Sequence, residues 1–259
     1  MNILDTIVDR KREEVLYRKQ LQPLSKLGSS KFYRRKTNKI ALQKPDGKAG
    51  IIAEFKRRSP SRGPIHPDAD VVKVARAYEK AGVAAMSILT DREFFGGSID
   101  DLVQVRQACP DLVLLRKDFI LDAYQLHEAS ACGADMVLLI AAVLERPEVE
   151  DLALEAAALG LQVLFEVHKK SELEKYHPEI GFVGVNNRDL KTFKVDTARS
   201  LELISSIPRQ AVPVSESGLS EPEEVRRLND AGFQLFLMGE NFMKEKDPGM
   251  ACRNFIREL

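Results

Sequence analysis

The chain has 259 residues, of which 44% are hydrophobic and 30% charged, with 39 Lys and Arg against 39 Asp and Glu. This balance is typical of a folded globule, and a chain of this length can bury a core without disulfide or metal support. Zero net charge with interspersed signs argues against a nucleic-acid binder, which relies on a basic face, and against a polybasic membrane anchor.

The cysteines and the first residues indicate the compartment. The chain has three cysteines, Cys109, Cys132 and Cys252, and no two of them form a C-x-x-C pair. An odd number at this spacing argues against a disulfide framework or a zinc knuckle, so we expect these residues to be small buried hydrophobes. The start, MNILDTIVDRKREEV, carries charges where a signal peptide needs an unbroken apolar stretch. The longest apolar run, residues 136–144, is about half of what a bilayer requires. We expect a soluble, cytoplasmic protein.

Residues 1–49 begin with a predicted helix and continue as a predicted connector. Apolar residues recur at helical spacing on one face of the first segment, namely Ile3, Leu4, Ile7, Val8, Val15 and Leu16. The stretch that follows, KLGSSKFYRRKTNKIALQKPDGKAG, is polar and basic, which is typical of a loop.

Eight short apolar runs follow, each ending in polar or glycine-containing sequence. Parallel strands covered by helices are apolar on both faces in this way. Amphipathic stretches such as ADVVKVARAYEKAG and EPEEVRRLNDAG separate the runs, and several end at a glycine suited to a helix C-terminus. The runs are GIIAEF near Ile51, AAMSIL near Met86, LVLL near Leu114, MVLLI near Leu138, LQVLFEV near Phe165, GFVGV near Val183, AVPVS near Val214 and FQLFLM near Leu237.

Eight strand-then-helix units across residues 50–259 average about 26 residues each, which favours an α/β fold of the (β/α)8 TIM-barrel type. A doubly wound sheet would use the same alternation, but no G-x-G-x-x-G follows a strand. We therefore predict a single barrel: residues 50–259 form the catalytic (β/α)8 part, and residues 1–49 form an N-terminal helix and connector of the same domain.

Two placements of the N-terminal helix remain open. It either caps the bottom of the barrel or lies near the active mouth. In the second case the basic connector, including Lys36 and Lys39, helps to close the mouth over an anionic substrate.

The active site of such a barrel lies at the C-terminal ends of its strands. Packed at one mouth, opposite charges hold each other ionised, while desolvation moves individual pKa values toward working pH. Two lysines, three glutamates and an arginine occupy strand ends here, namely Glu54, Lys56, Lys117, Glu166, Arg188 and Glu216.

The last two strand ends also suggest a phosphate site. Ser217, Gly218 and Gly239 can offer backbone N–H groups to a phosphate where many barrels bind one. Glu240 is an awkward neighbour for a dianion, so only its backbone would contribute there.

The four histidines, His66, His127, His168 and His177, form no H-E-x-x-H or comparable ligand spacing. We expect them to be surface residues or satisfied by local hydrogen bonds. The sequence predicts no metal and no nicotinamide or flavin cofactor.

Seven segments, taken together, resemble the indole-3-glycerol-phosphate synthase family of tryptophan biosynthesis. They run in order across residues 51–243, and the first is the most specific, whereas SESGL or FEVH alone would mean little. The resemblance implies a (β/α)8 barrel with an extra N-terminal helical segment. The segments are IIAEFKRRSPSRGPI, LTDREFFGGS, LLRKDFI, FEVH, VGVNNRDL, SESGL and LMGENFM.

The resemblance also implies a carboxy-lyase that closes the ring of 1-(2-carboxyphenylamino)-1-deoxyribulose 5-phosphate, releasing carbon dioxide and water. In that case Lys117 is the general acid, Glu166 takes part in proton transfer, and Glu54 and Lys56 are further catalytic positions. Five residues match substrate-side positions, namely Asn186, Arg188, Glu216, Ser217 and Phe119.

Ser59, Gly218 and Gly239 match positions around the phosphate in the family. Many members carry serine after the last glycine, so Glu240 puts a side-chain phosphate contact there in doubt.

The chemistry explains these residue types. Attack of an aromatic carbon on a ketone requires a protonated carbonyl oxygen, which a lysine of lowered pKa can provide near neutrality. Lys56 and Arg188 would lower the pKa of Lys117, and the glutamates would oppose them. Dehydration then needs an acid, either Lys117 or Lys56, and a base on opposite sides of the ring.

Three alternatives use the same residues. A Schiff-base aldolase would also place Lys117 at a strand end. Phosphoribosylanthranilate isomerase shares the barrel and pathway, but the first segment matches the synthase. A non-catalytic binding barrel would leave a full set of acids and bases unused. We expect a small phosphorylated substrate, no nucleic-acid or membrane partner, and a monomer or weak homo-oligomer.

Overall fold

The computed structural model describes residues 3–40, 49–189 and 192–259. Residues 41–48 of the predicted connector and Leu190, the last residue of the VGVNNRDL segment, lie outside the described residues.

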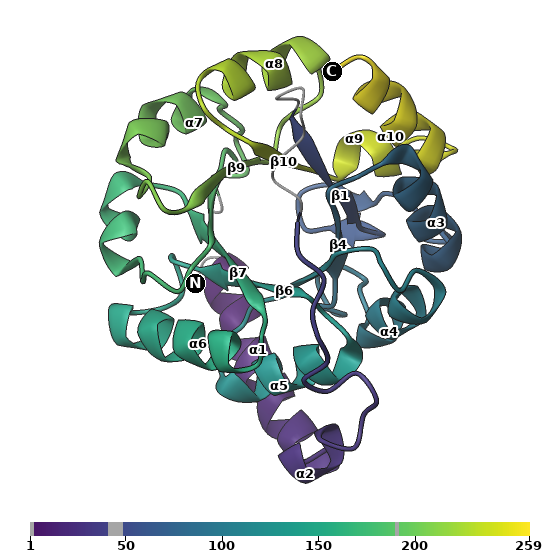
Figure 1. Cartoon of the computed structure of the whole chain (residues 1–259), viewed down its shortest axis with the longest axis vertical. Coiled ribbons are helices and arrows are strands. Elements are labelled where there is room, and N and C mark those ends of the chain that lie inside the picture. Colours follow the sequence, from purple (N-terminus) through teal and green to yellow (C-terminus); the bar gives the residue numbers. More distant parts are fainter. Residues whose placement is uncertain (1–2, 41–48, 190–191) are drawn as a thin grey trace.

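Eight parallel strands close into a barrel surrounded by helices (Figure 1), which confirms the predicted TIM barrel. Each strand coincides with one of the eight apolar runs. The ring order is β1-β10-β9-β8-β7-β6-β5-β4. The strands are β1 (Gly50–Phe55), β4 (Ala85–Leu89), β5 (Leu114–Lys117), β6 (Met136–Ile140), β7 (Gln162–Val167), β8 (Phe182–Asn186), β9 (Val212–Glu216) and β10 (Leu235–Met238). A two-residue hairpin, β2 (Arg58–Ser59) with β3 (Gly63–Pro64), follows β1.

Some of the outer helices begin and end at the residues that the sequence signals predict. For example, the Asp70 side chain accepts the N–H of Lys73 at the start of α3, and Gly82 ends that helix with φ 80°. No helix in the described part of the chain is long and apolar enough to cross a bilayer. The helices are α3 (Val71–Ala81), α4 (Ile99–Ala108), α5 (Ala123–Cys132), α6 (Arg146–Ala158), α7 (Ala198–Leu203), α8 (Pro222–Asp230), α9 (Glu240–Met243) and α10 (Pro248–Arg257), with 3₁₀ turns η1 (Lys170–Lys175) and η2 (Ile204–Ser206).

Inside the barrel, side chains from alternate strands meet in layers. One layer consists of four fully buried residues from β1, β5, β7 and β9, namely Ile52, Leu115, Leu164 and Val214. Because side chains two residues apart on a strand point to the same side, the residues two positions further along form the next layer toward the mouth. The apolar layer of Ile52, Leu115, Leu164 and Val214 is thus a floor beneath the layer that faces the mouth.

Helix α1 (Ile3–Leu21), followed by α2 (Leu24–Leu27), lies at the mouth of the barrel and not at its bottom. Ile3, Leu4 and Ile7 line the central cavity, and Lys11 pairs with Asp118, directly after β5. In Figure 1 α1 runs outward from near the centre of the ring to α2. The interpretation of α1 as a bottom cap is therefore wrong, because apolar side chains and a buried cation hold it at the strands' C-terminal ends.

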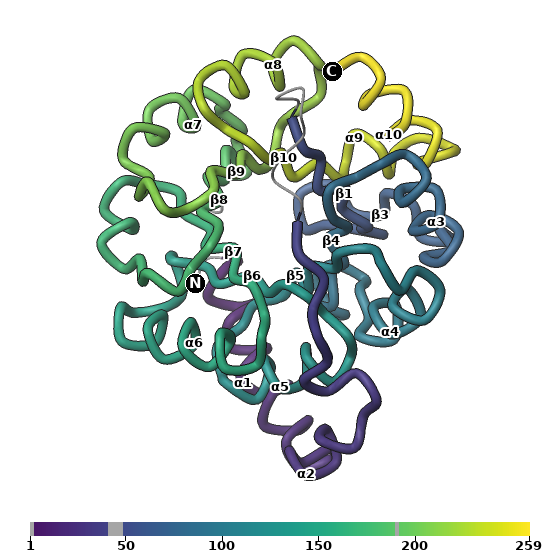
Figure 2. The backbone as a smooth tube through the Cα atoms, in the orientation of Figure 1, coloured from purple at the N-terminus to yellow at the C-terminus, as the bar shows by residue number. Residues whose placement is uncertain are grey.

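The connector after α2 crosses the bottom of the barrel on its way back to β1 (Figure 2). Asp135, which precedes β6, pairs with Arg35 and accepts the N–H of Asn38 at 2.7 Å. Lys39 donates to the carbonyl of Gly160, before β7, at 3.3 Å.

The prediction that Lys36 and Lys39 help to close the mouth is therefore wrong. The neighbouring Thr37 donates to the same Gly160 carbonyl at 2.7 Å, so this stretch lies at the opposite end of the barrel. The basic connector instead supplies charge to a carboxylate, Asp135, that is completely buried beneath the strands.

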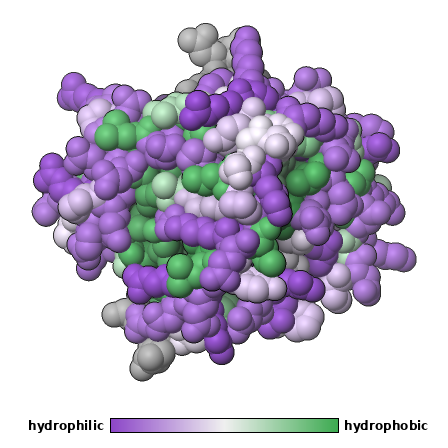
Figure 3. All heavy atoms as spheres, turned by 90° about the horizontal axis from the view of Figure 1, so that it is seen from below, coloured by the Kyte–Doolittle hydropathy of each residue, from purple (hydrophilic) through white to green (hydrophobic). Residues whose placement is uncertain are grey.

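Helix α1 buries little apolar surface. Seen from the α2 edge, the molecule is mostly hydrophilic with apolar side chains between (Figure 3). Leu16, Tyr17 and Leu21 of α1 are each more than half exposed. The buried residues of α1 are Ile7, Val8, Lys11 and Val15, so one of the four is a charged side chain.

Candidate active site

Four ionisable side chains form the layer directly above the apolar floor. They are Glu54, Lys117, Glu166 and Glu216, from the alternate strands β1, β5, β7 and β9. The Nζ of Lys117 lies 3.3 Å from Oε2 of Glu166 and 3.4 Å from Oε2 of Glu216. All three carboxylates are buried. Three buried acids therefore surround one ammonium group at the centre of the mouth.

Two glycines make room for these carboxylates. A Cβ on Gly184 would overlap Oε1 of Glu216, and a Cβ on Gly239 would lie 2.6 Å from Oε1 of Glu54. At Gly218, which has φ 79°, a Cβ would overlap Val195. Enlarging Gly239 would thus displace Glu54.

The ammonium of Lys117 is held in its charged form. Burial disfavours the charge, but the carboxylates of Glu166, Glu216 and Glu54 outweigh burial and raise the pKa of Lys117 above its ordinary value. The prediction of a lowered pKa is therefore wrong for this site. The reason for the raised pKa is geometric, because two carboxyl groups lie within 3.4 Å of Nζ of Lys117.

The two acids beside Lys117 differ in protonation. Burial, with smaller contributions from Glu166 and Glu54, raises the pKa of Glu216 to about 8 despite Lys117. Burial acts in the same direction on Glu166, but Lys117 and then His168 outweigh it and lower the pKa of Glu166. The directions of these two shifts favour the protonated form of Glu216 and the ionised form of Glu166, so Glu166 is the better base of the two.

A second acid–base pair lies across the barrel from Glu166. Lys56 donates to Oε1 of Glu54 at 2.6 Å. Glu54 lies in β1 and Lys56 is the first residue after it, and β1 is four places from β7 in the ring of eight strands. A molecule at the centre of the mouth would therefore have Lys56 and Glu166 on opposite sides.

A cavity of about 570 Å³ opens above this layer. One side of it is apolar, and there Phe95 and Phe119 pack with their ring centres 6.1 Å apart. The apolar lining on this side comes from the loops, the strands and α1, and it includes Ile3, Leu4, Ile7, Leu89, Phe95, Phe119, Leu138 and Ile140.

The other side of the cavity is polar and cationic. This side includes Ser59, Ser217, Gly218 and Gly239. Ser217 has a positive φ of 70°, as its neighbour Gly218 also does. Three cations line the cavity in addition to the two lysines, namely Arg62, Arg188 and Lys244.

Glu240 bridges two of these cations. Its carboxylate lies 2.9 Å from Nη2 of Arg62 and 3.5 Å from Nη2 of Arg188. The side chain is thus an acceptor between arginines of two different loops, which explains how an acid is accommodated beside this end of the cavity.

All twelve side-chain and backbone positions predicted from the sequence line this one cavity. They are Glu54, Lys56, Ser59, Lys117, Phe119, Glu166, Asn186, Arg188, Glu216, Ser217, Gly218 and Gly239.

Sequence reasoning missed two parts of the site. His168 is neither a surface residue nor satisfied: its Nε2 lies 3.6 Å from Oε1 of Glu166, and neither ring nitrogen has a hydrogen-bond partner among the described residues. The signal was present, because His168 follows Glu166 by two residues and so points to the same side.

The apolar residues of α1 that line the cavity were also missed, because nothing in the local sequence shows which end of the barrel α1 covers. They are Ile3, Leu4 and Ile7.

The described residues contain no group of three or more His, Cys, Asp or Glu side chains that could hold a metal ion.

The chain is similar to one well-defined family. The family model described as indole-3-glycerol phosphate synthase matches residues 4–259. Among curated proteins, the indole-3-glycerol phosphate synthase of Bacteroides thetaiotaomicron is 45% identical over 260 residues, covering 100% of this chain and 99% of the relative. That of Caldanaerobacter subterraneus is 44% identical over 258 residues, covering 99% and 98%.

Solved structures of lower identity share the fold. A tryptophan synthase structure from Pyrococcus furiosus superposes with a TM-score of 0.59 at 14% identity, covering 81% of this chain and 97% of that one. KGPDC from Streptococcus mutans gives 0.61 at 13% identity, covering 81% and 96%. At such identities the likeness concerns the barrel alone.

Proposed function

The chain belongs to the indole-3-glycerol phosphate synthase family, and we propose that the twelve predicted cavity residues carry out that family's reaction. The protein is a carboxy-lyase of tryptophan biosynthesis that converts 1-(2-carboxyphenylamino)-1-deoxyribulose 5-phosphate to indole-3-glycerol phosphate. The observation that carries the residue assignment is the layer formed by Lys117 and the three buried glutamates around it.

The two sides of the cavity suit the two ends of this substrate. We assign the aromatic ring to the apolar side, which is lined by Phe95, Phe119 and apolar residues of α1. The phosphate then meets the polar side, with Ser59, Gly218 and Gly239. The ketone between these ends comes to the central layer.

Ring closure joins the carboxylate-bearing aromatic carbon to the ketone carbon. Lys117, which is charged and points into the cavity, donates a proton to the ketone oxygen as the new bond forms. Loss of carbon dioxide from the same aromatic carbon then returns its electron pair to the ring and restores aromaticity. A hydroxyl-bearing ring intermediate remains.

Dehydration completes the indole. Glu166 is ionised and accepts a proton from the carbon next to the nitrogen, while an acid protonates the departing hydroxyl. Lys56, held by Glu54 on the far side of the barrel from Glu166, is the acid that this arrangement favours. The hydroxyl leaves as water and the new double bond forms.

We further propose a cytoplasmic protein that acts as a monomer or weak homo-oligomer and needs no metal or redox cofactor. Balanced charge supports the absence of a nucleic-acid partner. A Schiff-base aldolase is less well supported, because its lysine must be neutral to attack a carbonyl, whereas the acids around Lys117 keep it charged.

The test replaces the proposed base. Glu166→Gln keeps the shape of the side chain but cannot accept the proton, so dehydration should slow more than ring closure. In a single turnover, carbon dioxide release should precede indole absorbance, and the hydroxylated intermediate should accumulate. Simultaneous loss of both signals would refute Glu166 as the dehydration base, and failure of the unmodified protein to form indole would refute the proposed function.

A further inference from the structure

The most deeply buried cation of α1 lies outside the proposed chemistry. The side chain of Lys11 is 2% exposed, and its Nζ lies 2.6 Å from Glu14, 3.0 Å from Asp91 and 2.9 Å from Asp118. These acids belong to three separate elements: α1 itself, the loop after β4 and the residue after β5. One ammonium group therefore joins the N-terminal helix to two loops at the mouth of the barrel.

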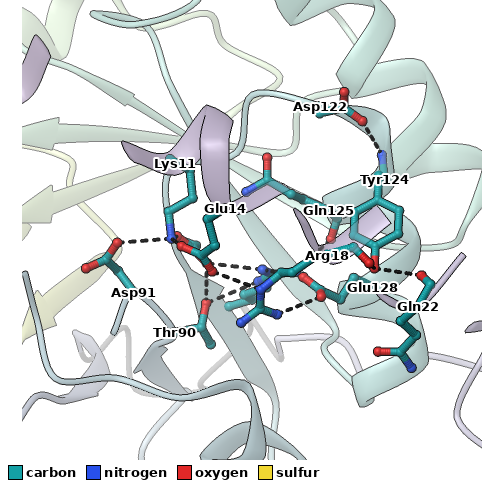
Figure 4. Close-up of polar contacts among 12 residues, drawn as sticks. Lys11, Glu14, Arg18, Gln22, Thr90, Asp91, Asp122, Tyr124, Gln125 and Glu128 are labelled. Atoms are coloured by element: carbon teal, nitrogen blue, oxygen red, sulfur yellow. Dashed lines mark hydrogen bonds and ion pairs between the residues drawn. The ribbon is translucent and has the colours of Figure 1, made fainter. Parts of the chain in front are cut away.

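Further ion pairs close a ring of alternating charge, and Figure 4 labels its members Lys11, Glu14, Arg18 and Glu128. Asp118 contacts Arg116 at 3.1 Å, and Arg116 contacts Glu128 at 2.8 Å. Glu128 then contacts Arg18 at 2.7 Å, and Arg18 returns to Glu14 at 2.9 Å. Three cations and three acids thus alternate through α1, the end of β5 and α5. Such a network depends on the position of every member, because a buried charge without its partner is costly.

The ring adjoins the active site on two sides. Asp118 follows Lys117 directly, and its Oδ1 also accepts the N–H of Phe119 at 2.8 Å. On α1, Lys11 lies one turn after Ile7, which lines the cavity. The same carboxylate therefore contacts the backbone of a cavity aromatic residue and the ammonium that holds the cavity's helical wall.

Apolar packing alone defines the register of α1 weakly. Only Ile7, Val8 and Val15 are buried apolar residues in a helix of 19 residues. Sliding or rotating the helix would cost little apolar contact, but it would separate Lys11 from two buried carboxylates, Asp91 and Asp118. The ionic contacts thus select one position of the helix on the barrel.

We propose that Lys11 is a positioning residue for the synthase reaction. Its ammonium holds α1 in the register that places Ile3, Leu4 and Ile7 against the aromatic end of the substrate. This inference rests on the proposed function, because it assumes that the apolar side of the cavity binds the ring. Lys11 itself touches neither the substrate nor the reacting atoms.

The test compares Lys11→Met with Lys19→Met. Lys19 lies on the same helix and pairs with Asp122, but it is outside the ring and partly exposed. We expect Lys11→Met to raise KM for the carboxyphenylamino substrate by about tenfold or more, with a smaller change in kcat. Inhibition by inorganic phosphate should stay within about twofold of the unmodified protein, because the phosphate side lies away from α1. Lys19→Met should match the unmodified protein in all three quantities.

Limited trypsin digestion reports directly on the helix. Lys11→Met should be cleaved within α1, after Arg12 or Arg18, while the barrel stays intact, and Lys19→Met should resist. Because removing the ammonium leaves Asp91 buried without its cation, the double variant Lys11→Met with Asp91→Asn separates stability from positioning. Its melting temperature should recover, while KM should stay high. If Lys11→Met fails to fold, the double variant supplies the same measurements.

An unchanged KM with α1 still resistant to trypsin would overturn the proposal. Parallel weakening of substrate and phosphate binding would also overturn it, since that result indicates general damage to the mouth. If KM of the double variant returned to the value of the unmodified protein, Lys11 would only stabilise the fold and would not position α1. If the unmodified protein makes no indole, the proposed function fails instead, and trypsin cleavage still reports whether Lys11 holds the helix.

Discussion

We expect Lys117 to make two contributions: it donates a proton in the reaction, and its positive charge pairs with the buried side chains of Glu166 and Glu216. Lys117→Met removes both, so kcat should fall by about 10²–10⁴-fold while the substrate still binds. Steady-state assays of indole formation check this. Near-normal turnover would rule out the acid role.

A matched variant separates the two contributions. Lys117→Arg keeps a cation between the acids but cannot release its proton, so stability should return and kcat should not. Lys117→Met should still unfold cooperatively, because the floor of Ile52, Leu115, Leu164 and Val214 is untouched, but at a lower temperature. The strand-end position does not by itself protect the fold, since the acids that lose their cation are buried.

The carboxylate of Glu240 pairs with Arg62 and Arg188, so we expect it to compete with the phosphate of the substrate for these cations. Glu240→Gln removes a negative charge from this end of the cavity while keeping a hydrogen-bonding side chain. We expect a lower KM and stronger inhibition by inorganic phosphate, each by a few-fold, with kcat little changed. Weaker phosphate inhibition would show instead that Glu240 organises the arginines for binding.

At the scale of elements, the N-terminal segment serves both ends of the barrel. Deleting residues 1–22 removes α1, so KM should rise steeply while the barrel remains folded. Deleting residues 1–45 also removes Arg35 and Asn38 from the buried Asp135 and Ile40 from the core. The longer deletion should therefore lower the melting temperature strongly, and circular dichroism with heating distinguishes the two.

Equal behaviour of the two truncated proteins would contradict this division of roles. If the shorter deletion already unfolds the barrel, α1 is needed for the fold as well as for the mouth. If the longer one is stable, the contacts of Asp135 at the bottom contribute little.

At the scale of the whole molecule, Glu216 links stability to pH. Its pKa rises from 4.5 to about 8 on folding, so between these values the folded state holds a proton that the unfolded state has lost. Its contribution to stability is therefore complete below about pH 4.5 and is lost as pH rises through about 8. The slope for one proton is at most about 1.4 kcal/mol per pH unit.

Denaturant unfolding of the unmodified protein and of Glu216→Gln at several pH values measures this contribution. The free energy of unfolding of the unmodified protein should fall more steeply than that of the variant between about pH 5 and 8. Parallel curves would mean that Glu216 is ionised in the folded protein.

Much of this molecule follows from local sequence. Apolar runs of strand length, amphipathic stretches and glycine helix ends predict all eight strands and the closed barrel, because each pattern reports burial within a few residues. The twelve site residues could be named because every barrel presents its strand ends at one mouth, and the seven family segments mark which ones matter.

Tertiary structure alone decided the rest. The position of α1 at the mouth depends on Lys11 meeting acids that lie 80 and 107 positions further along the chain, at Asp91 and Asp118. The raised pKa of Lys117 depends on acids from β7 and β9 that converge on β5 only when the barrel closes. Burial and charge act through space, so residue order predicts which groups are present, whereas the closed barrel determines their neighbours and their protonation.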